Sequence, residues 1–503
     1  MSSKRWKIEP AVFFPSAAII VLVLGFGVVA PERAQGLFLG LQDAIVSHLD
    51  WLFIASSALF LGFSLLVAGA PTGKIRLGPD EEPPAYGFPS WFAMLFSAGM
   101  GIGIMFYGVA EPILHYAAPP RGTGGTPEAA RLALTITLFH WGLHAWAVYV
   151  VMGLAIAYFG HRRGLPLAVR STLYPLLGAR IHGPWGHAVD TLAVFGTLFG
   201  LATSLGLGAM QINAGLNHLL GTEESTTVQV GLVALVTTGA TISLVLGLDR
   251  GIRRLSELNV ALAVILLLFV VTAGPTVLLL QSFPERLFDY GTQLVPLALS
   301  LRPLGDLDWS KSWTIFYWAW WIAWSPFVGT FIARISRGRT VREFVLGVLL
   351  VPTLVSALWF TVFGWTAIQL DQAEPGIATA VQANVATGLY AVLARLPLAG
   401  ATSLLAVGIV AIFFITSSDS GSFVVDMLTS GGQADPPVWQ RVFWAVSEGI
   451  VAAALLLSGG LSALRSAAIN TGLPFCIVLL LVCAGLGRSL WHEARSRRGE
   501  PSV

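Results

Sequence analysis

Long apolar stretches recur along the whole chain and constrain its fold more than any other feature. Each one is long enough to cross a hydrocarbon core of about 30 Å, which takes roughly 20 helical residues. Charged residues make up only 11% of the 503 residues, too few to cover a soluble protein of this size. The sequence therefore predicts an all-α polytopic membrane protein with twelve transmembrane helices, near residues 12–30, 51–69, 91–116, 132–159, 189–218, 228–248, 258–282, 312–335, 344–369, 396–428, 442–464 and 466–490.

The basic residues predict the orientation. Lysine and arginine resist translocation, and most of the 29 in this chain fall in alternate connecting segments, beginning with Lys4, Arg5 and Lys7. Both termini are therefore predicted to lie in the cytosol, with the first stretch kept as a helix rather than removed as a signal peptide. The formal net charge of +2 gives no sign of a surface that binds nucleic acid.

The spacing of the predicted helices repeats. The third to seventh helices and the eighth to twelfth are offset by about 210 residues, and a repeat of five helices must be inverted in the membrane because five is odd. Chance spacing is the alternative to this 5+5 inverted repeat. The predicted parts are an N-terminal tail with two peripheral helices (1–90), the first repeat (91–283), an amphipathic interfacial helix and linker (284–311), the second repeat (312–490) and a short cytosolic tail (491–503).

The first helix of each repeat contains residues that favour a break. In FSAGMGIGIMFYGVAEP, Gly99, Gly101 and Gly103 each weaken a helix by about 1 kcal/mol relative to alanine. An unwound segment from Gly99 to Gly103 is expected to line a polar cavity, and a GxxxG packing face is the alternative. In the eighth helix the matching break is predicted at Ser325 and Pro326.

Tryptophan is concentrated in the eighth helix, in FYWAWWIAWSPFVGTF. The segment from Trp313 to Trp324 covers about 16 Å of helical rise, which is too deep for a single interfacial belt. Tyr317, Trp321 and Trp324 share one helical face. The fourth helix, in LFHWGLHAWAVYVV, carries a second aromatic set within an arc of about 140°, which consists of Trp141, Trp146 and Tyr149.

Two aromatic walls in a low-dielectric cavity suit a cation that cannot form hydrogen bonds, because each ring face attracts it by about 0.5–2 kcal/mol. A quaternary ammonium is therefore the expected ligand. A primary amine or a metal ion would call for carboxylates, and none is expected among these aromatic residues. Close packing of bulky core residues is the alternative explanation.

Three segments resemble the betaine/carnitine/choline transporter family. They are WTIFYWAWWIAWSPFVGTFIARISRGRTVREF (residues 313–344), GMGIGIMFYGVAEP and FHWGLHAW, and the resemblance covers the third to twelfth helices in order. It implies the LeuT-like inverted-repeat fold of amino-acid-type sodium symporters, preceded by two extra helices. It also implies a homotrimer in the cell inner membrane of a bacterium.

The resemblance implies a set of binding residues. The quaternary ammonium is expected to lie among Trp141, Trp146, Tyr149 and Trp321. The substrate carboxylate is expected to face exposed backbone N–H groups at Gly99, Met100, Gly101 and Gly103. The inner access path is expected to be lined by Phe316, Trp320 and Trp324. Family members that select choline look to carry Asp at the position of Gly103, so this glycine favours a zwitterionic betaine.

The tenth helix contains a candidate ion site. In AIFFITSSDSGSF, Thr416 and Ser417 offer hydroxyl oxygens, the type of ligand that a hard cation such as sodium prefers. The resemblance implies one sodium ion bound by these hydroxyls together with the carbonyls of Phe413, Ser97 and Met100. Hydrogen bonds from both hydroxyls back to helix carbonyls are the alternative.

A second sodium site in betaine-transporting relatives would use Thr197, Phe327 and a hydroxyl one turn after Thr197. Leu201 occupies that position here. The sequence therefore predicts coupling to a single sodium ion.

Rival functions depend on a few ionisable residues. His140 and His144 have the i, i+4 spacing that can chelate zinc, which makes a membrane metalloenzyme one rival. No Glu or Asp joins them in the local sequence, so core histidines are expected instead. Asp419 and Glu448 lie within or near apolar stretches and keep proton coupling as an alternative. A sensor that binds solute without moving it is the other rival.

The sequence thus predicts a secondary active transporter, not an enzyme, that imports a quaternary-ammonium zwitterion by symport with sodium and without a cofactor. Proton-coupled or sodium-independent exchange of choline-type or carnitine-type substrates is the alternative. Glycine betaine, carnitine, a sulfonium analogue and ectoine all fit the pattern. The expected partners are this substrate, the sodium ion, membrane lipids and further copies of the chain, with no nucleic acid.

Overall fold

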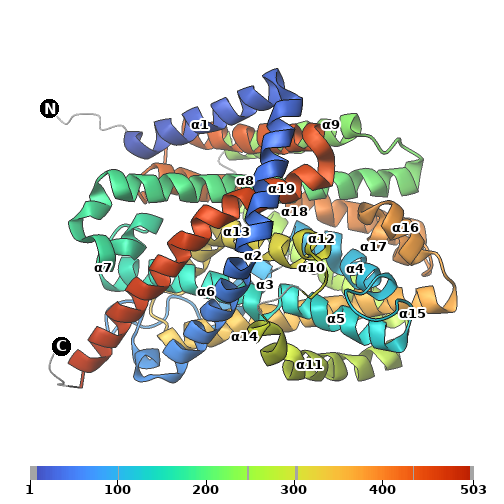
Figure 1. Ribbon diagram of the computed structural model, residues 1–503, viewed down its shortest axis with the longest axis horizontal. Helices are drawn as coiled ribbons and strands as arrows, with labels where there is room; N and C mark the ends of the chain where they lie inside the picture. The colour runs from blue at the N-terminus through green and yellow to red at the C-terminus, as the bar shows by residue number, and fades with distance from the viewer. Residues whose placement is uncertain (1–7, 100, 246–248, 301–303, 434–435, 499–503) are drawn as a thin grey trace.

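The computed structural model describes residues 8–99, 101–245, 249–300, 304–433 and 436–498, and helices dominate all of these ranges (Figure 1). The α-helices are α1 (Pro10–Val29), α2 (Pro31–Gly69), α3 (Phe88–Gly99), α4 (Ile102–Ala117), α5 (Pro127–Trp141), α6 (Leu143–Ala157), α7 (Tyr174–Leu177), α8 (Pro184–Leu220), α9 (Thr226–Val245), α10 (Asp249–Ala273), α11 (Thr276–Leu299), α12 (Leu307–Ser312), α13 (Thr314–Ile335), α14 (Val341–Phe360), α15 (Thr366–Ala373), α16 (Ile377–Ala383), α17 (Gly388–Leu393), α18 (Ala399–Thr429) and α19 (Val438–Ser496).

Eight helical segments within the described ranges are long and apolar enough to cross a membrane. The longest, α19, covers both of the last two predicted helices, and its kink at Gly459 and Gly460 lies before the end predicted for the first of them, 442–464. The all-helical structure agrees with the predicted fold class of a polytopic membrane protein. The count of twelve crossings, the division into parts and the LeuT-like repeat stay predictions.

The boundary of the seventh predicted helix is wrong. The sequence predicts one helix over 258–282, whereas α10 ends at Ala273 and α11 begins at Thr276. The N–H of Gly274 closes the last turn on the carbonyl of Val270, and Pro275 has no N–H with which to continue the helix. The predicted interfacial helix, α11, therefore starts earlier in the chain than expected.

The fourth predicted helix is interrupted, which the sequence analysis did not anticipate. Gly142 adopts φ −97° and ψ −136° between α5 and α6. A Cβ atom at this position would lie 2.5 Å from the carbonyl oxygen of Leu138, so a side chain does not fit there. The hydroxyl of Tyr290 on α11 accepts a 3.0 Å hydrogen bond from the N–H of Leu143, one of the first groups of α6 that lack an intrahelical partner.

The predicted break in the eighth helix is also wrong, because α13 runs through Pro326 without interruption. Proline leaves the carbonyl four residues earlier without its usual partner. Here the hydroxyl of Ser325 donates to that carbonyl, of Ile322, at 2.7 Å, and the hydroxyl of Thr330 donates to the carbonyl of Pro326 at 2.6 Å. The hydroxyl of Ser325 thus satisfies the carbonyl that the proline leaves free.

The aromatic helix α13 lies near the middle of the molecule (Figure 1). It packs against α6, α8 and α19. The side chains of Tyr317, Trp318 and Trp320 are fully buried as a result. These tryptophans therefore belong to the protein interior rather than to an interfacial belt.

An ion-pair cluster joins three segments that are far apart in the sequence. Asp80, in the loop that precedes α3, accepts hydrogen bonds from Arg162 at 3.0 Å and from Arg497. Arg162 ends the π-helical turn that follows α6 (Tyr158–Arg162), and its Nε donates to Glu493 of α19 at 2.6 Å. The cluster connects the end of α19 to the loop after α2.

Candidate substrate site

The third predicted helix is broken, as its glycines indicate. The first half, α3, ends at Gly99, and the second half, α4, begins at Ile102 after Gly101, which has extended backbone angles of φ −166° and ψ −173°. The break is shorter than predicted because Gly103 lies inside α4. Met100 lies outside the described residues. The first N–H groups of α4 have no intrahelical acceptors and are suited to an anion.

Gly103 lies against two of the predicted aromatic residues. A Cβ atom there would lie 2.8 Å from Cη2 of Trp320 and 2.9 Å from Cη2 of Trp141. Both distances are shorter than carbon atoms tolerate, so any side chain at this position would have to displace an indole. Glycine therefore allows α4 to approach the aromatic rings closely.

The structure brings the four predicted onium-binding residues into one chain of ring contacts. Trp321 of α13 lies in the middle, with ring centroids 4.9 Å from Trp141 of α5 and 6.3 Å from Tyr149 of α6. Trp146 packs edge-on against Tyr149 at 5.3 Å. All four side chains are buried, with exposed fractions between 3% and 7%. We call these four residues the aromatic cage.

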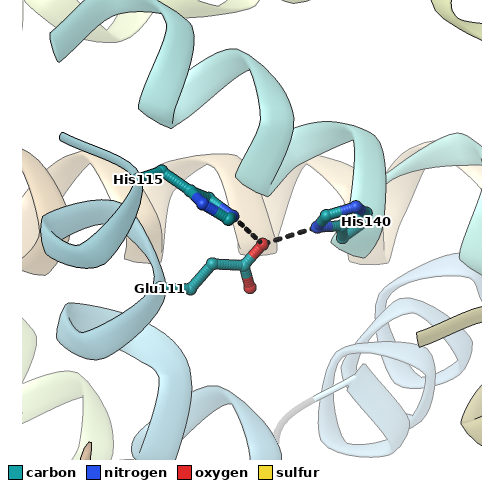
Figure 2. Close-up of side chains that lie close together, drawn as sticks. All are labelled: Glu111, His115 and His140. Carbon is teal, nitrogen blue, oxygen red and sulfur yellow. Dashed lines mark hydrogen bonds and ion pairs between the residues drawn. The ribbon is translucent and has the colours of Figure 1, made fainter. Parts of the chain in front are cut away.

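A carboxylate, that of Glu111 on α4, is hydrogen-bonded to the cage residue Trp141, contrary to the expectation that none would be present. Figure 2 shows this carboxylate between His115 and His140. Oε1 of Glu111 on α4 lies 2.7 Å from Nδ1 of His140 and 3.4 Å from Nε2 of His115. Oε2 accepts hydrogen bonds from the indole Nε1 of Trp141 at 2.8 Å and from the hydroxyl of Tyr317 at 2.5 Å. The Glu111 side chain is fully buried.

His140 and His144 are both buried, as expected for core histidines, and they lack the geometry of the rival zinc site. The break at Gly142 separates the two residues, so the i, i+4 geometry of a continuous helix does not apply. The ring of His144 packs instead against Phe139, with centroids 4.8 Å apart, and against Trp318. The signal that sequence reasoning missed was Glu111, which lies in the same quoted motif as Gly103.

The residues that could hold a metal ion are therefore different from the His140–His144 pair of the rival zinc site. Donor atoms of Glu111, His115 and His140 all lie within 4.8 Å of one another, and one carboxylate with two imidazoles is a donor set that zinc uses. Protein groups already occupy much of this set, however. Nε2 of His140 is hydrogen-bonded to the hydroxyl of Thr314 at 2.9 Å, and both carboxylate oxygens of Glu111 have partners.

The three predicted access-path residues form a continuous aromatic column on α13. The rings of Phe316 and Trp320 stack at 5.4 Å, and Trp324 packs edge-on against Trp320 at 6.3 Å. The column packs closely against α8. A Cβ atom at Gly200 of α8 would lie only 2.3 Å from Cδ1 of Trp324. Side chains thus fill the predicted path, and passage of a solute along it would require them to move.

The predicted ion site is only partly described. The hydroxyl of Thr416 donates to the carbonyl of Ile412 at 2.9 Å and lies 3.3 Å from the carbonyl of Phe413. This is the back-bonding arrangement that sequence analysis kept as the alternative, although the hydroxyl oxygen retains lone pairs for a cation. Ser417 is half-buried beside it. The two remaining predicted ligands are Ser97, in the last turn of α3, and Met100, outside the described residues.

Leu201, which stands where a second sodium site would need a hydroxyl, makes an apolar contact. The side chain of Leu201 packs on α18 where a Cβ atom at Gly421 would lie 2.2 Å from its Cδ1 atom. The hydroxyl of Thr197 is buried and has no hydrogen-bond partner among the described residues. Leucine supplies no oxygen ligand, and coupling to a single sodium ion stays a prediction.

Comparison with known proteins places this geometry in a family. Residues 11–495 match the profile of the betaine/carnitine/choline family transporters. The chain is 47% identical to the glycine betaine transporter OpuD of Bacillus subtilis over 488 residues, which cover 96% of this chain and 95% of that protein. It is 46% identical to the glycine betaine transporter of Acinetobacter baylyi, over 97% of this chain and 74% of that one.

A further relative is named for a different substrate. The high-affinity choline transport protein of Escherichia coli is 43% identical over 98% of this chain and 73% of its own length. The family match covers residues 11–495, nearly the whole chain. The chain therefore belongs to the betaine/carnitine/choline transporter family.

Proposed function

We propose that this protein is a secondary active transporter that imports a quaternary-ammonium zwitterion, such as glycine betaine, by symport with sodium. The observation that carries this proposal is the aromatic cage, in which Trp321 contacts Trp141 and Tyr149 beside the break at Gly101. The names of the relatives from Bacillus subtilis and Acinetobacter baylyi support a betaine as the substrate.

The chemistry of the cage suits a trimethylammonium group. Such a cation has no N–H to donate, so it loses no hydrogen bond on leaving water, and ring faces attract it by about 0.5–2 kcal/mol each. The substrate carboxylate would then face the start of α4, where unpaired N–H groups and the helix dipole favour an anion. One site thus has a place for each charge of a betaine.

The absence of a side chain at Gly103 favours a zwitterion over choline. An acidic residue here could balance the charge of a substrate that lacks a carboxylate. Gly103 instead leaves room only for the rings of Trp141 and Trp320. The Escherichia coli relative keeps choline as the second candidate substrate.

Sodium is the proposed coupling ion because the hydroxyls of Thr416 and Ser417 are oxygen donors deep in α18. One neutral site of this kind holds one monovalent cation. We further propose that the protein works as a homotrimer in the cell inner membrane, in contact with lipids and with both termini in the cytosol.

One observation favours proton coupling as the second candidate mechanism. Glu448 of α19 is fully buried, and its Oε2 accepts hydrogen bonds from Ser422 at 3.2 Å and from Ser418 at 3.4 Å. Ser418 follows Ser417 directly, so this buried carboxylate is bonded to the residue adjacent in sequence to a proposed sodium ligand. Buried carboxylates in membrane proteins often carry protons.

Uptake of labelled glycine betaine into proteoliposomes tests the proposal. Three conditions are compared: an inward sodium gradient, an inward proton gradient and no gradient. Accumulation only with sodium supports symport with sodium, and accumulation only with protons supports the second mechanism. Exchange of labelled for unlabelled betaine without any gradient separates a transporter from a sensor, because a sensor cannot exchange solute across the membrane.

A further inference from the structure

Glu111 stands out because a carboxylate buried among aromatic rings is costly unless it is fully hydrogen-bonded. Here it is surrounded by donors. Oε2 binds Trp141 and Tyr317 at 2.8 and 2.5 Å, and Oε1 lies 2.7 Å from His140. No substrate is needed to explain how Glu111 is stabilised, so the remaining question is what it does for its partners.

Two of these partners bear directly on the cage. Trp141 is a cage residue, and Tyr317 stacks on the cage residue Trp321 with centroids 5.9 Å apart at 19°. Trp141 belongs to α5, Tyr317 to α13 and Glu111 to α4. A single carboxylate therefore fixes rings from two different helices relative to the break at Gly101.

The hydrogen bond to Trp141 also has an electronic consequence. An indole N–H that donates to a carboxylate becomes more electron-rich on its ring face, because the anion polarises the ring. Cation–π attraction depends on this negative face. The negative charge of Glu111 thus reaches the cage through the ring, while the carboxylate itself stays behind the indole.

We propose that Glu111 is a positioning residue that orients Trp141 and Tyr317 and makes the aromatic cage selective for onium groups. The inference rests on the proposed function, since it concerns the same cage. A carboxylate inside the cage would serve primary ammonium ions as well, by accepting their N–H groups. A carboxylate behind the ring strengthens attraction for a cation without offering it an acceptor.

The charge-specific test compares two ligands of the same shape. Glycine betaine carries a trimethylammonium group. Tert-butylacetate, the 3,3-dimethylbutanoate anion, carries an uncharged tert-butyl group in its place. Dissociation constants for both are measured by competition against labelled glycine betaine on purified full-length protein. The preference is the ratio of the two constants, and it reports how strongly the cage favours the positive charge.

The variant Glu111→Gln removes the charge while keeping the size of the side chain. We expect betaine affinity to fall about tenfold and tert-butylacetate affinity to change less than about twofold, so that the preference falls. Glu128→Gln is the matched control, because Glu128 lies exposed in the first turn of α5. It should leave both constants unchanged.

A double variant tests whether the effect passes through the indole. In a Trp141→Phe background, the ring has no N–H to donate to Glu111. Adding Glu111→Gln to this background should lower the preference by less than about twofold, because the two changes remove the same interaction. If Glu111→Gln lowers the preference as much in this background as it does in the wild type, the effect does not pass through Trp141.

The remaining outcomes are also informative. Equal losses for both ligands in Glu111→Gln would show a purely structural role and overturn the inference, as would no loss at all. Glu111→Asp keeps the charge and should retain the preference even where the Gln variant does not fold; loss of preference in it overturns the inference. Wild-type protein that binds no glycine betaine contradicts the proposed function itself.

Discussion

The indole Nε1 of Trp321 donates a 2.9 Å hydrogen bond to the carbonyl oxygen of His140. This carbonyl lies in the last turn of α5, where helix carbonyls lack intrahelical partners. The break at Gly142 therefore supplies the acceptor that holds the central ring of the aromatic cage. An interruption in one helix thus orients a binding residue on another.

Gly103 is expected to be needed for its lack of a side chain. In Gly103→Ala the new Cβ atom would lie within 3 Å of Trp320 and Trp141, and overpacking of this kind costs about 1–3 kcal/mol. We expect the affinity for glycine betaine to fall roughly tenfold in a binding assay. Gly408→Ala is the control, since a Cβ atom at Gly408 meets no neighbouring atom within 4 Å. Equal affinities in the two variants would contradict the close approach of α4.

A side chain at Gly200 should affect the rate of uptake more than the affinity for betaine. A Cβ atom there would lie 2.3 Å from Trp324 in the access path, away from the cage residues. We expect Gly200→Ala to lower the maximal rate of uptake several-fold and to change the dissociation constant of betaine by less than about twofold. A loss of affinity with an unchanged maximal rate would place Trp324 in the binding site instead.

Thr416 and Ser417 should set the response to sodium. Thr416→Ala and Ser417→Ala remove oxygen ligands, so each is expected to raise the sodium concentration for half-maximal uptake at least tenfold. Thr402→Ala is a matched control because the hydroxyl of Thr402 makes the same bond back to its own helix, to Leu398. If all three variants respond to sodium like the wild type, the ion site lies elsewhere.

The ion-pair cluster around Asp80 predicts a pH dependence of stability. Hydrogen bonds from Arg162 and Arg497 lower the pKa of Asp80 below its usual value of 3.8. The unfolded chain therefore binds this proton more readily, and the stabilisation is present above about pH 4 and lost as the pH falls below the folded-state pKa. Asp80 is 57% exposed, so the contribution is at most about 1 kcal/mol.

Asp80→Asn should accordingly lower the melting temperature of the detergent-solubilised protein slightly at pH 7. The difference from wild type should shrink as the pH approaches 3, because protonated Asp80 no longer attracts the arginines. Glu81→Gln provides the comparison in the adjacent position. A difference that grows toward low pH would have the wrong sign for this cluster.

Many of the candidate site residues could be predicted from the sequence, but the residues that hold them in place could not. The break at Gly101 follows from three closely spaced glycines, and the aromatic cage residues follow from their pattern and motif. The break at Gly142 does not, because a single glycine is usually tolerated in a helix. Its partner, Tyr290, lies on α11, far along the chain.

Two other features were misjudged, for different reasons. A proline in a membrane helix suggests a break, yet Ser325 and Thr330 satisfy the backbone of α13 locally. Glu111 reads as an isolated acid at the end of a motif, and only the packing of α4 against α5 reveals that it bonds Trp141. Contacts between helices decide the role of Glu111, whereas hydroxyls within the same helix support the continuity of α13.

The central claim is that the aromatic cage binds the substrate. The most direct measurement is the dissociation constant of glycine betaine for purified wild-type protein, Trp321→Leu and Trp185→Leu, with sodium present. Trp185 is 68% exposed at the start of α8 and serves as the control. The account predicts at least a tenfold loss of affinity in Trp321→Leu and none in Trp185→Leu. Unchanged affinity in Trp321→Leu would contradict it.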